Sequence, residues 1–140
     1  MFVDTNVLVY ASVKGAPNRD LARAALGRQA ASGEALCISR QVLREFVAVI
    51  TRPQTWERAH SCADAAVAAA ALAQDFEVLE DVPAVWDNPI DLCRRFQFGG
   101  RQVHDANIVA TMLAHRETRL LTFNVGDFER FAALIDVTAA

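Results

Sequence analysis

The chain has 140 residues, of which 53% are hydrophobic and 22% are charged, and its formal net charge is −3. This length and composition predict one folded domain with a substantial core and exclude a disordered chain. No apolar run approaches the roughly 20 residues of a membrane-spanning helix, and Asp4 interrupts the N-terminus before a secretory signal could form. We therefore expect a single cytoplasmic domain over residues 1–140, without a membrane partner.

Cysteine usage and charge exclude several further classes. Cys37, Cys62 and Cys93 are an odd number at wide spacing, which predicts reduced thiols and no disulfide framework. No C-x-x-C pair or histidine cluster supports a zinc site. With a pI near 5.5 the protein has no global positive field, so a nucleic acid would have to be held by local cations.

Short apolar runs alternate with helix-forming segments along the whole chain. Such alternation predicts an α/β fold with a mostly parallel sheet that is covered on both faces. In chain order we expect a strand over 1–4, helices over 7–12 and 19–32, a strand over 36–38, a helix to 51 capped by Ser39, a helix over 61–74, a strand near Val78, helices over 84–96 and 103–116, and strands over 120–122 and 134–137.

Carboxylates and one amide follow the strands, where ligands bind in parallel sheets. Asp4 ends the first strand, Asn124 and Asp127 follow the strand over 120–122, and Glu45 lies two turns into the helix after the second strand. Each has an ordinary structural alternative: Asp4 and Asp127 could be helix N-caps, Asn124 a turn residue and Glu45 a solvated rim residue. Together they indicate convergence at one edge of the sheet.

Asp105 is the most informative of the carboxylates. On a helical wheel it falls within the apolar stripe formed by Ile108, Val109 and Met112. A favourable interaction with the helix dipole, about 0.3–1 kcal/mol, explains an Asp in the first turn but not its placement on the apolar face. Burying a carboxylate there costs several kcal/mol without a compensating partner, which favours a functional role.

Converging carboxylates repel one another unless a cation compensates them. No lysine or histidine cluster is nearby in the sequence, so a divalent cation is the expected partner. Oxygen ligands select Mg²⁺ or Mn²⁺ over zinc or copper. Such an ion activates water and neutralises phosphate oxygens.

Four motifs carry a resemblance to a known family. F-V-D-T-N at residues 2–6, R-E-F around Glu45, H-D-A-N at 104–107 and L-L-T-F-N-V-G-D-F at 120–128 resemble PIN-domain ribonucleases. The size and single-domain layout look most like the VapC-type toxins of toxin–antitoxin pairs. The resemblance implies an α/β/α sandwich and Mg²⁺- or Mn²⁺-dependent cleavage of RNA.

The resemblance also assigns site residues. Asp4, Glu45 and Asp105 match the three principal acidic positions, and the fourth position is either Asn124 or Asp127. The implied reaction is phosphodiester hydrolysis by metal-activated water. Asp4, Asp105 and Asp127 would be the metal ligands, and Glu45 would bind or orient the water. The resemblance is compatible with either one or two metal ions. The positions that hydrogen-bond around the site in relatives are matched by Thr5, Asn6 and Thr122.

Several residues near these motifs have two interpretations. His104 precedes Asp105 and is expected to cap or orient the helix entry, with a general base as the alternative. Trp56 and Trp86 could stack on bases, although core or interface packing is the simpler expectation. Candidate RNA-binding cations, each with a solvated surface charge as its alternative, are Arg40, Arg44, Arg94, Arg95 and Arg101.

The expected partners are RNA, a VapB-like antitoxin whose C-terminal segment blocks the carboxylate cleft, and a second copy of the chain in a homodimer.

Two other classes of protein fit the sequence poorly. A response-regulator receiver needs a lysine late in the chain, and Lys14 is the only lysine here. A dehalogenase-type phosphatase needs a D-x-D motif, which Asp4-Thr5-Asn6 lacks. The remaining alternative is a non-catalytic PIN-like module that binds RNA or protein.

Overall fold

Five short parallel strands form one sheet in the computed structural model, which describes residues 1–140. The spatial order is β3-β2-β1-β4-β5, with every neighbouring pair parallel. The strands are β1 (Phe2–Val3), β2 (Cys37–Ser39), β3 (Glu77–Leu79), β4 (Arg119–Thr122) and β5 (Asp136–Ala139). The predicted α/β fold with a parallel sheet is confirmed.

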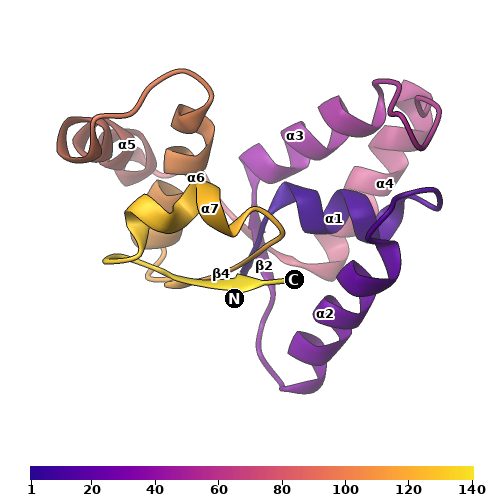
Figure 1. Ribbon diagram of the computed structural model, residues 1–140, viewed down its shortest axis with the longest axis horizontal. Helices are drawn as coiled ribbons and strands as arrows, with labels where there is room; N and C mark the ends of the chain where they lie inside the picture. Colours follow the sequence, from indigo (N-terminus) through magenta and orange to yellow (C-terminus); the bar gives the residue numbers. More distant parts are fainter.

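Helices cover both faces of the sheet (Figure 1). From β1 the chain steps to β2 and then β3, crosses back to β4 and steps outward to β5. Since parallel crossovers are right-handed, the reversal of direction sends the later helices to the opposite face. One group comprises α1 (Thr5–Ser12), α2 (Arg19–Ala31), α3 (Arg40–Ile50) and α4 (Cys62–Asp75), and the other comprises α5 (Pro83–Phe96), α6 (Gln102–Ala114) and α7 (Val125–Phe128).

The core is densest where the three inner strands meet these helices. Phe2, Ile38 and Leu120 are completely buried, as is Phe46 of α3. These strands read as continuous apolar runs because both of their faces are covered. The sheet is therefore a rigid platform for whatever follows its carboxyl ends.

Most element boundaries fall where the sequence places them. The Ser39 side chain accepts a hydrogen bond from the Val42 amide, so the predicted cap of α3 is confirmed. The predicted last strand over 134–137 is wrong by two residues. The Leu134 amide donates to the Phe131 carbonyl in a turn that follows a 3₁₀ helix over Glu129–Phe131, and β5 starts only at Asp136.

The order of the strands fixes where a ligand can bind. Between β1 and β4 the connections leave in opposite directions, which opens a crevice at the carboxyl ends of these two strands. The Asp4 amide donates to the Leu121 carbonyl across this pair. Asp4 therefore lies at the centre of the crevice.

None of the helices combines the length and the hydrophobicity that a membrane-spanning helix requires.

Candidate active site

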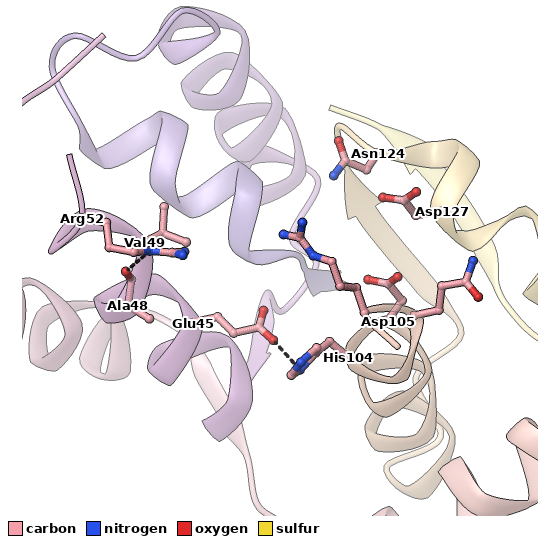
Figure 2. A pocket seen from close by; sticks show the side chains of 10 residues that line it. Glu45, Ala48, Val49, Arg52, His104, Asp105, Asn124 and Asp127 are labelled. Atoms are coloured by element: carbon pink, nitrogen blue, oxygen red, sulfur yellow. Dashed lines mark hydrogen bonds and ion pairs between the residues drawn. The ribbon is translucent and has the colours of Figure 1, made fainter. Parts of the chain in front are cut away.

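A cleft of about 740 Å³ opens at the carboxyl edge of the sheet, between α3 on one side and α6 and α7 on the other (Figure 2). A recess of about 340 Å³ adjoins it and reaches down to Asp4. Both cavities are lined by Glu45, Asp105, Asn124, Asp127, Val49 and Arg101. The structure thus brings together the carboxylates that the sequence scatters over more than 120 positions.

Asp4 is held by side chains from β4 and α1. Its Oδ2 accepts hydrogen bonds from Thr122 Oγ1 at 2.6 Å and from Asn6 Nδ2 at 2.7 Å. Asn6 in turn accepts from the Phe123 amide at 3.1 Å. Asp4 occupies the N-cap position of α1, but its side chain makes no capping hydrogen bond. The capping alternative therefore does not account for this carboxylate.

Burial raises the pKa of Asp4 to about 6. The hydrogen bond from Thr122 opposes this shift, whereas the negative charge of Glu45 adds to it. Only 7% of Asp4 is exposed, and the structure offers it no cation. A buried carboxylate with a raised pKa in a cleft is typical of a functional site.

Glu45 faces the cleft from α3 with both of its oxygens engaged. Thr5 Oγ1 donates to Oε2 at 3.0 Å, and Gln41 Nε2 donates to Oε1 at 2.6 Å. His104 Nδ1 lies 3.5 Å from the same Oε1 and approaches it from α6 (Figure 2). The His104 side chain therefore points across the cleft and does not cap α6.

Asp105 lies in the first turn of α6, half-buried, with its carboxylate in the cleft. Burial, and after it the charges of Asp127, Asp4 and Glu45, raise its pKa to about 6. The dependence on three other acids shows that the carboxylates share one electrostatic environment.

Asn124 and Asp127 both reach the cleft from the segment after β4. Asn124 occupies the N-cap position of α7, and Asp127 lies inside this helix. The N-cap alternative for Asp127 is therefore wrong. Both side chains are exposed and both line the cleft, so either can supply the fourth oxygen ligand.

The arginines divide into paired and cleft-lining groups. Arg40 forms two hydrogen bonds with Glu80, and Arg44 lies 3.5 Å from Asp81. Arg101 lines both cavities. Of the remaining candidates, Arg94 pairs with Asp91 and Arg95 lies over the ring of Phe96.

Comparison with known proteins identifies the family. The sequence matches the PIN domain family over residues 1–134. This chain belongs to the PIN domain family. No curated protein matches it significantly.

Solved PIN-domain structures share the fold at low sequence identity. A chain of VapBC2 from Rickettsia felis, bound to promoter DNA, has a TM-score of 0.72 at 19% identity, with 99% of this chain and 96% of that chain covered. VapC20 of Mycobacterium tuberculosis, a toxin that cleaves the sarcin–ricin loop, has a TM-score of 0.68 at 21% identity, with 96% of this chain and 95% of that chain covered. VapBC-1 from Haemophilus influenzae has a TM-score of 0.70 at 16% identity, with 99% of this chain and 96% of that chain covered.

The donor chemistry of this PIN domain suits a divalent cation. Four carboxylates line the two cavities, together with the imidazole of His104 and the side-chain amides of Asn6, Gln54, Gln102 and Asn124, and no cysteine is among the lining residues. No three carboxylate, imidazole or thiolate groups are already gathered around one point. Carboxylate and amide oxygens are the ligands that Mg²⁺ and Mn²⁺ prefer. Burial, and after it the charges of Asp127, Asp4 and Glu45, raise the pKa of Asp105, and a divalent cation would compensate this negative charge.

Three residues of the site escaped the sequence analysis. Gln41 is 5% exposed and binds Glu45, and Asn107 donates to Gln41. Arg52 lines the cleft, with its Nε bound to the Ala48 carbonyl. The H-D-A-N motif contains Asn107, but nothing in the sequence indicates its contact with a residue 66 positions away.

The two tryptophans have different environments. Trp56 is half-buried, lines the recess and packs edge-on against Tyr10 at 6.3 Å. Trp86 is 72% exposed on α5, so packing in the core is excluded for it.

Proposed function

We propose that this PIN domain is a Mg²⁺- or Mn²⁺-dependent endoribonuclease that acts as the toxin of a toxin–antitoxin pair. The observation that carries the proposal is the convergence of Asp4, Glu45, Asp105 and Asp127 on one recess, where burial, and after it the charges of the other three acids, raise the pKa of Asp105. Outside the site, Glu80 is by contrast paired with Arg40, which lowers the pKa of Glu80.

Each side chain has a distinct part in the proposed reaction. Asp4, Asp105 and Asp127 would hold the ion, and Asn124 adds a neutral oxygen donor. When bound, the ion supplies an activated water and neutralises negative charge on the phosphate. Glu45, which is anchored from both sides by Thr5 and Gln41, is placed to orient the attacking water and to accept its proton.

RNA reaches an acidic protein only through local positive charge. Arg101 and Arg52 both line the cleft, and neither forms an ion pair with a carboxylate. We therefore assign to these two arginines the contacts with backbone phosphates. RNA is favoured as the substrate because VapC20, which shares the fold, cleaves the sarcin–ricin loop.

Two protein partners belong to the proposal. Several solved relatives are toxin–antitoxin complexes, which supports a VapB-like antitoxin that covers the cleft. A homodimer is supported by three exposed apolar side chains at four-residue spacing. They are Val82, the N-cap residue of α5, and Trp86 and Ile90 of that helix, which are 37%, 72% and 37% exposed. Light scattering of the wild type and of Trp86→Asp tests the dimer.

The test of the nuclease is cleavage of a mixed transfer and ribosomal RNA pool with Mg²⁺, with Mn²⁺ and with a chelator. We expect discrete products only from the metal-loaded wild type, and none from folded Asp4→Asn and Asp105→Asn. Equal cutting by all three proteins would indicate a contaminant. A wild type that binds RNA but cuts none with either ion would favour the non-catalytic module.

A further inference from the structure

Gln41 is a buried amide whose hydrogen-bonding groups all point into the site. Its two Nε2 protons are donated to Glu45 Oε1 at 2.6 Å and to the His104 carbonyl at 3.0 Å, and its Oε1 accepts from Asn107 Nδ2. A primary amide has two donors and a carbonyl acceptor, and here all are used. The orientation of the Gln41 amide is therefore fixed, with its NH₂ group toward Glu45.

This amide joins two helices that otherwise pack on different neighbours. α3, which carries Glu45, packs against α1 and α4, whereas α6, which carries Asp105, packs against α5 and α7. In Figure 1 the two helices lie apart, α3 beside α4 and α6 beside α5 and α7. Through His104 and Asn107, Gln41 ties α3 to the turn of α6 on which Asp105 lies.

We propose that Gln41 and Asn107 are positioning residues, which together fix the Glu45 carboxylate across the cleft from Asp105 and set the separation of α3 and α6. Asn107 holds the Gln41 amide in one orientation, and Gln41 holds Glu45. The inference rests on the proposed nuclease function, because the placement of Glu45 affects cleavage only if Glu45 takes part in it.

Two substitutions of Gln41 distinguish the effect of its hydrogen-bond donors from the effect of its size. Gln41→Met keeps the side-chain length but removes both donors. Gln41→Glu keeps the shape and the acceptor for Asn107, but places an oxygen against Glu45 and against the His104 carbonyl. Asn107→Leu leaves Gln41 intact and removes only the hydrogen bond that orients its amide. Gln74→Met and Gln74→Glu, at an exposed position of α4, are the matched controls.

Groups that orient metal-binding side chains typically contribute 10–100-fold to metal affinity or activity. We expect Gln41→Met and Gln41→Glu to lower kcat about 10–100-fold, with the KM for the RNA that the wild type cuts nearly unchanged. Because the charge of Glu45 acts on Asp4 and Asp105, its displacement in Gln41→Met should also lower the affinity for Mn²⁺ alone, measured by electron paramagnetic resonance. Asn107→Leu should show a smaller decrease, and the Gln74 variants none. Circular dichroism melts establish that each variant is folded.

A double-mutant cycle shows whether the effect passes through Glu45. In a Glu45→Ala background, Gln41→Met should cause no further loss of kcat or of Mn²⁺ affinity. The same fold-loss in both backgrounds would mean that Gln41 acts only on the general structure, and would overturn the inference. Folded Gln41 variants with wild-type kcat and Mn²⁺ affinity would overturn it too.

Failure of this inference differs from failure of the proposed function. A wild type that binds Mn²⁺ and cuts RNA, together with inert Gln41 and Asn107 variants, overturns only the positioning role. A wild type that neither binds Mn²⁺ nor cuts RNA overturns the nuclease function and the positioning role with it.

Discussion

Thr122 Oγ1 donates a hydrogen bond of 2.6 Å to Asp4 Oδ2, joining the ends of β4 and β1 across 118 positions of the chain. Thr122 Oγ1 also accepts a hydrogen bond from the Asn124 backbone amide at 3.0 Å. One hydroxyl thus connects the most buried carboxylate of the site with the segment that carries Asn124 and Asp127.

Removing this hydroxyl should weaken the protein. Thr122→Val leaves the buried Asp4 carboxylate without its hydroxyl donor, so the pKa of Asp4 should rise further, because the Thr122 hydrogen bond lowers it. We expect the free energy of unfolding, measured by urea denaturation, to fall by about 1–3 kcal/mol. Thr122→Ser keeps the hydroxyl and is the control. Equal stability of the Val and Ser variants would contradict this prediction.

The metal-free protein should become more stable as the pH falls from 7 to 5. In the folded state Asp4 and Asp105 hold their protons up to a pKa of about 6, whereas their ordinary pKa is 3.8. Between these values the folded state binds more protons than the unfolded state, so stability decreases as the pH rises. At about 1.4 kcal/mol per pKa unit, Asp4 contributes at most ~3 kcal/mol. Asp105 contributes less, because solvent screens a half-exposed group.

The measurement is a set of urea denaturation curves between pH 5 and 7 in the presence of a chelator. Asp4→Asn should flatten the pH dependence and should be more stable than the wild type at pH 7. A wild type whose stability rises steadily from pH 5 to 7 would show that these carboxylates are not strained in the folded state.

Divalent ions should restore the stability that the metal-free protein loses at pH 7, where Asp4 and Asp105 are ionised. An ion that binds only the folded state adds about 2.7 kcal/mol at 100 times its Kd. We expect Mg²⁺ or Mn²⁺ to raise the Tm of the wild type at pH 7 and a chelator to restore the lower value. Asp105→Asn should show little increase, and Asp91→Asn, on the surface of α5, should behave as the wild type. An equal increase in both variants would place the ion elsewhere.

The two cleft arginines should set the salt dependence of RNA binding. Each phosphate contact contributes about 0.7 to the slope of log K against log salt for a single strand. Arg101→Gln and Arg52→Gln should each reduce this slope, measured on the inactive Asp105→Asn background. Arg94→Gln, whose arginine is paired with Asp91, should not reduce it. Identical slopes for all three would assign the RNA path to another surface.

The loop that carries Trp56 should depend on Gly15. A Cβ at Gly15 would lie 2.4 Å from the Trp56 carbonyl oxygen, so any side chain there displaces the segment that lines the recess. We expect Gly15→Ala to cost about 1–3 kcal/mol and to shift Trp56 fluorescence in a Trp86→Phe background. Gly27→Ala, on an open face of α2, should be neutral or stabilising. No fluorescence shift in Gly15→Ala would contradict the close packing.

Local patterns predicted the helices, the parallel sheet and the clustering of Asp4 and Asp105, since these depend on periodicity and on positions next to strand ends. Strand order was not predictable, because the pairing of Phe2 with Leu120 is non-local. Gln41 was overlooked for the same reason: on α3 it is an ordinary polar residue, and its burial results from contacts with α6. The ion pairs of Arg40 with Glu80 and of Arg44 with Asp81 were not predictable either, because their partners lie far along the chain.

The central strand β1 has only two residues, yet it pairs with β4 near the other end of the chain. A ribosome-bound chain cannot complete the sheet until β4 has emerged, and Asp127 follows later still. The carboxylates therefore meet only when synthesis of the domain is almost finished. A nascent chain that stops before β4, which begins at Arg119, should therefore lack both the paired strands and the cleft, so any cutting of RNA waits until the domain is nearly complete.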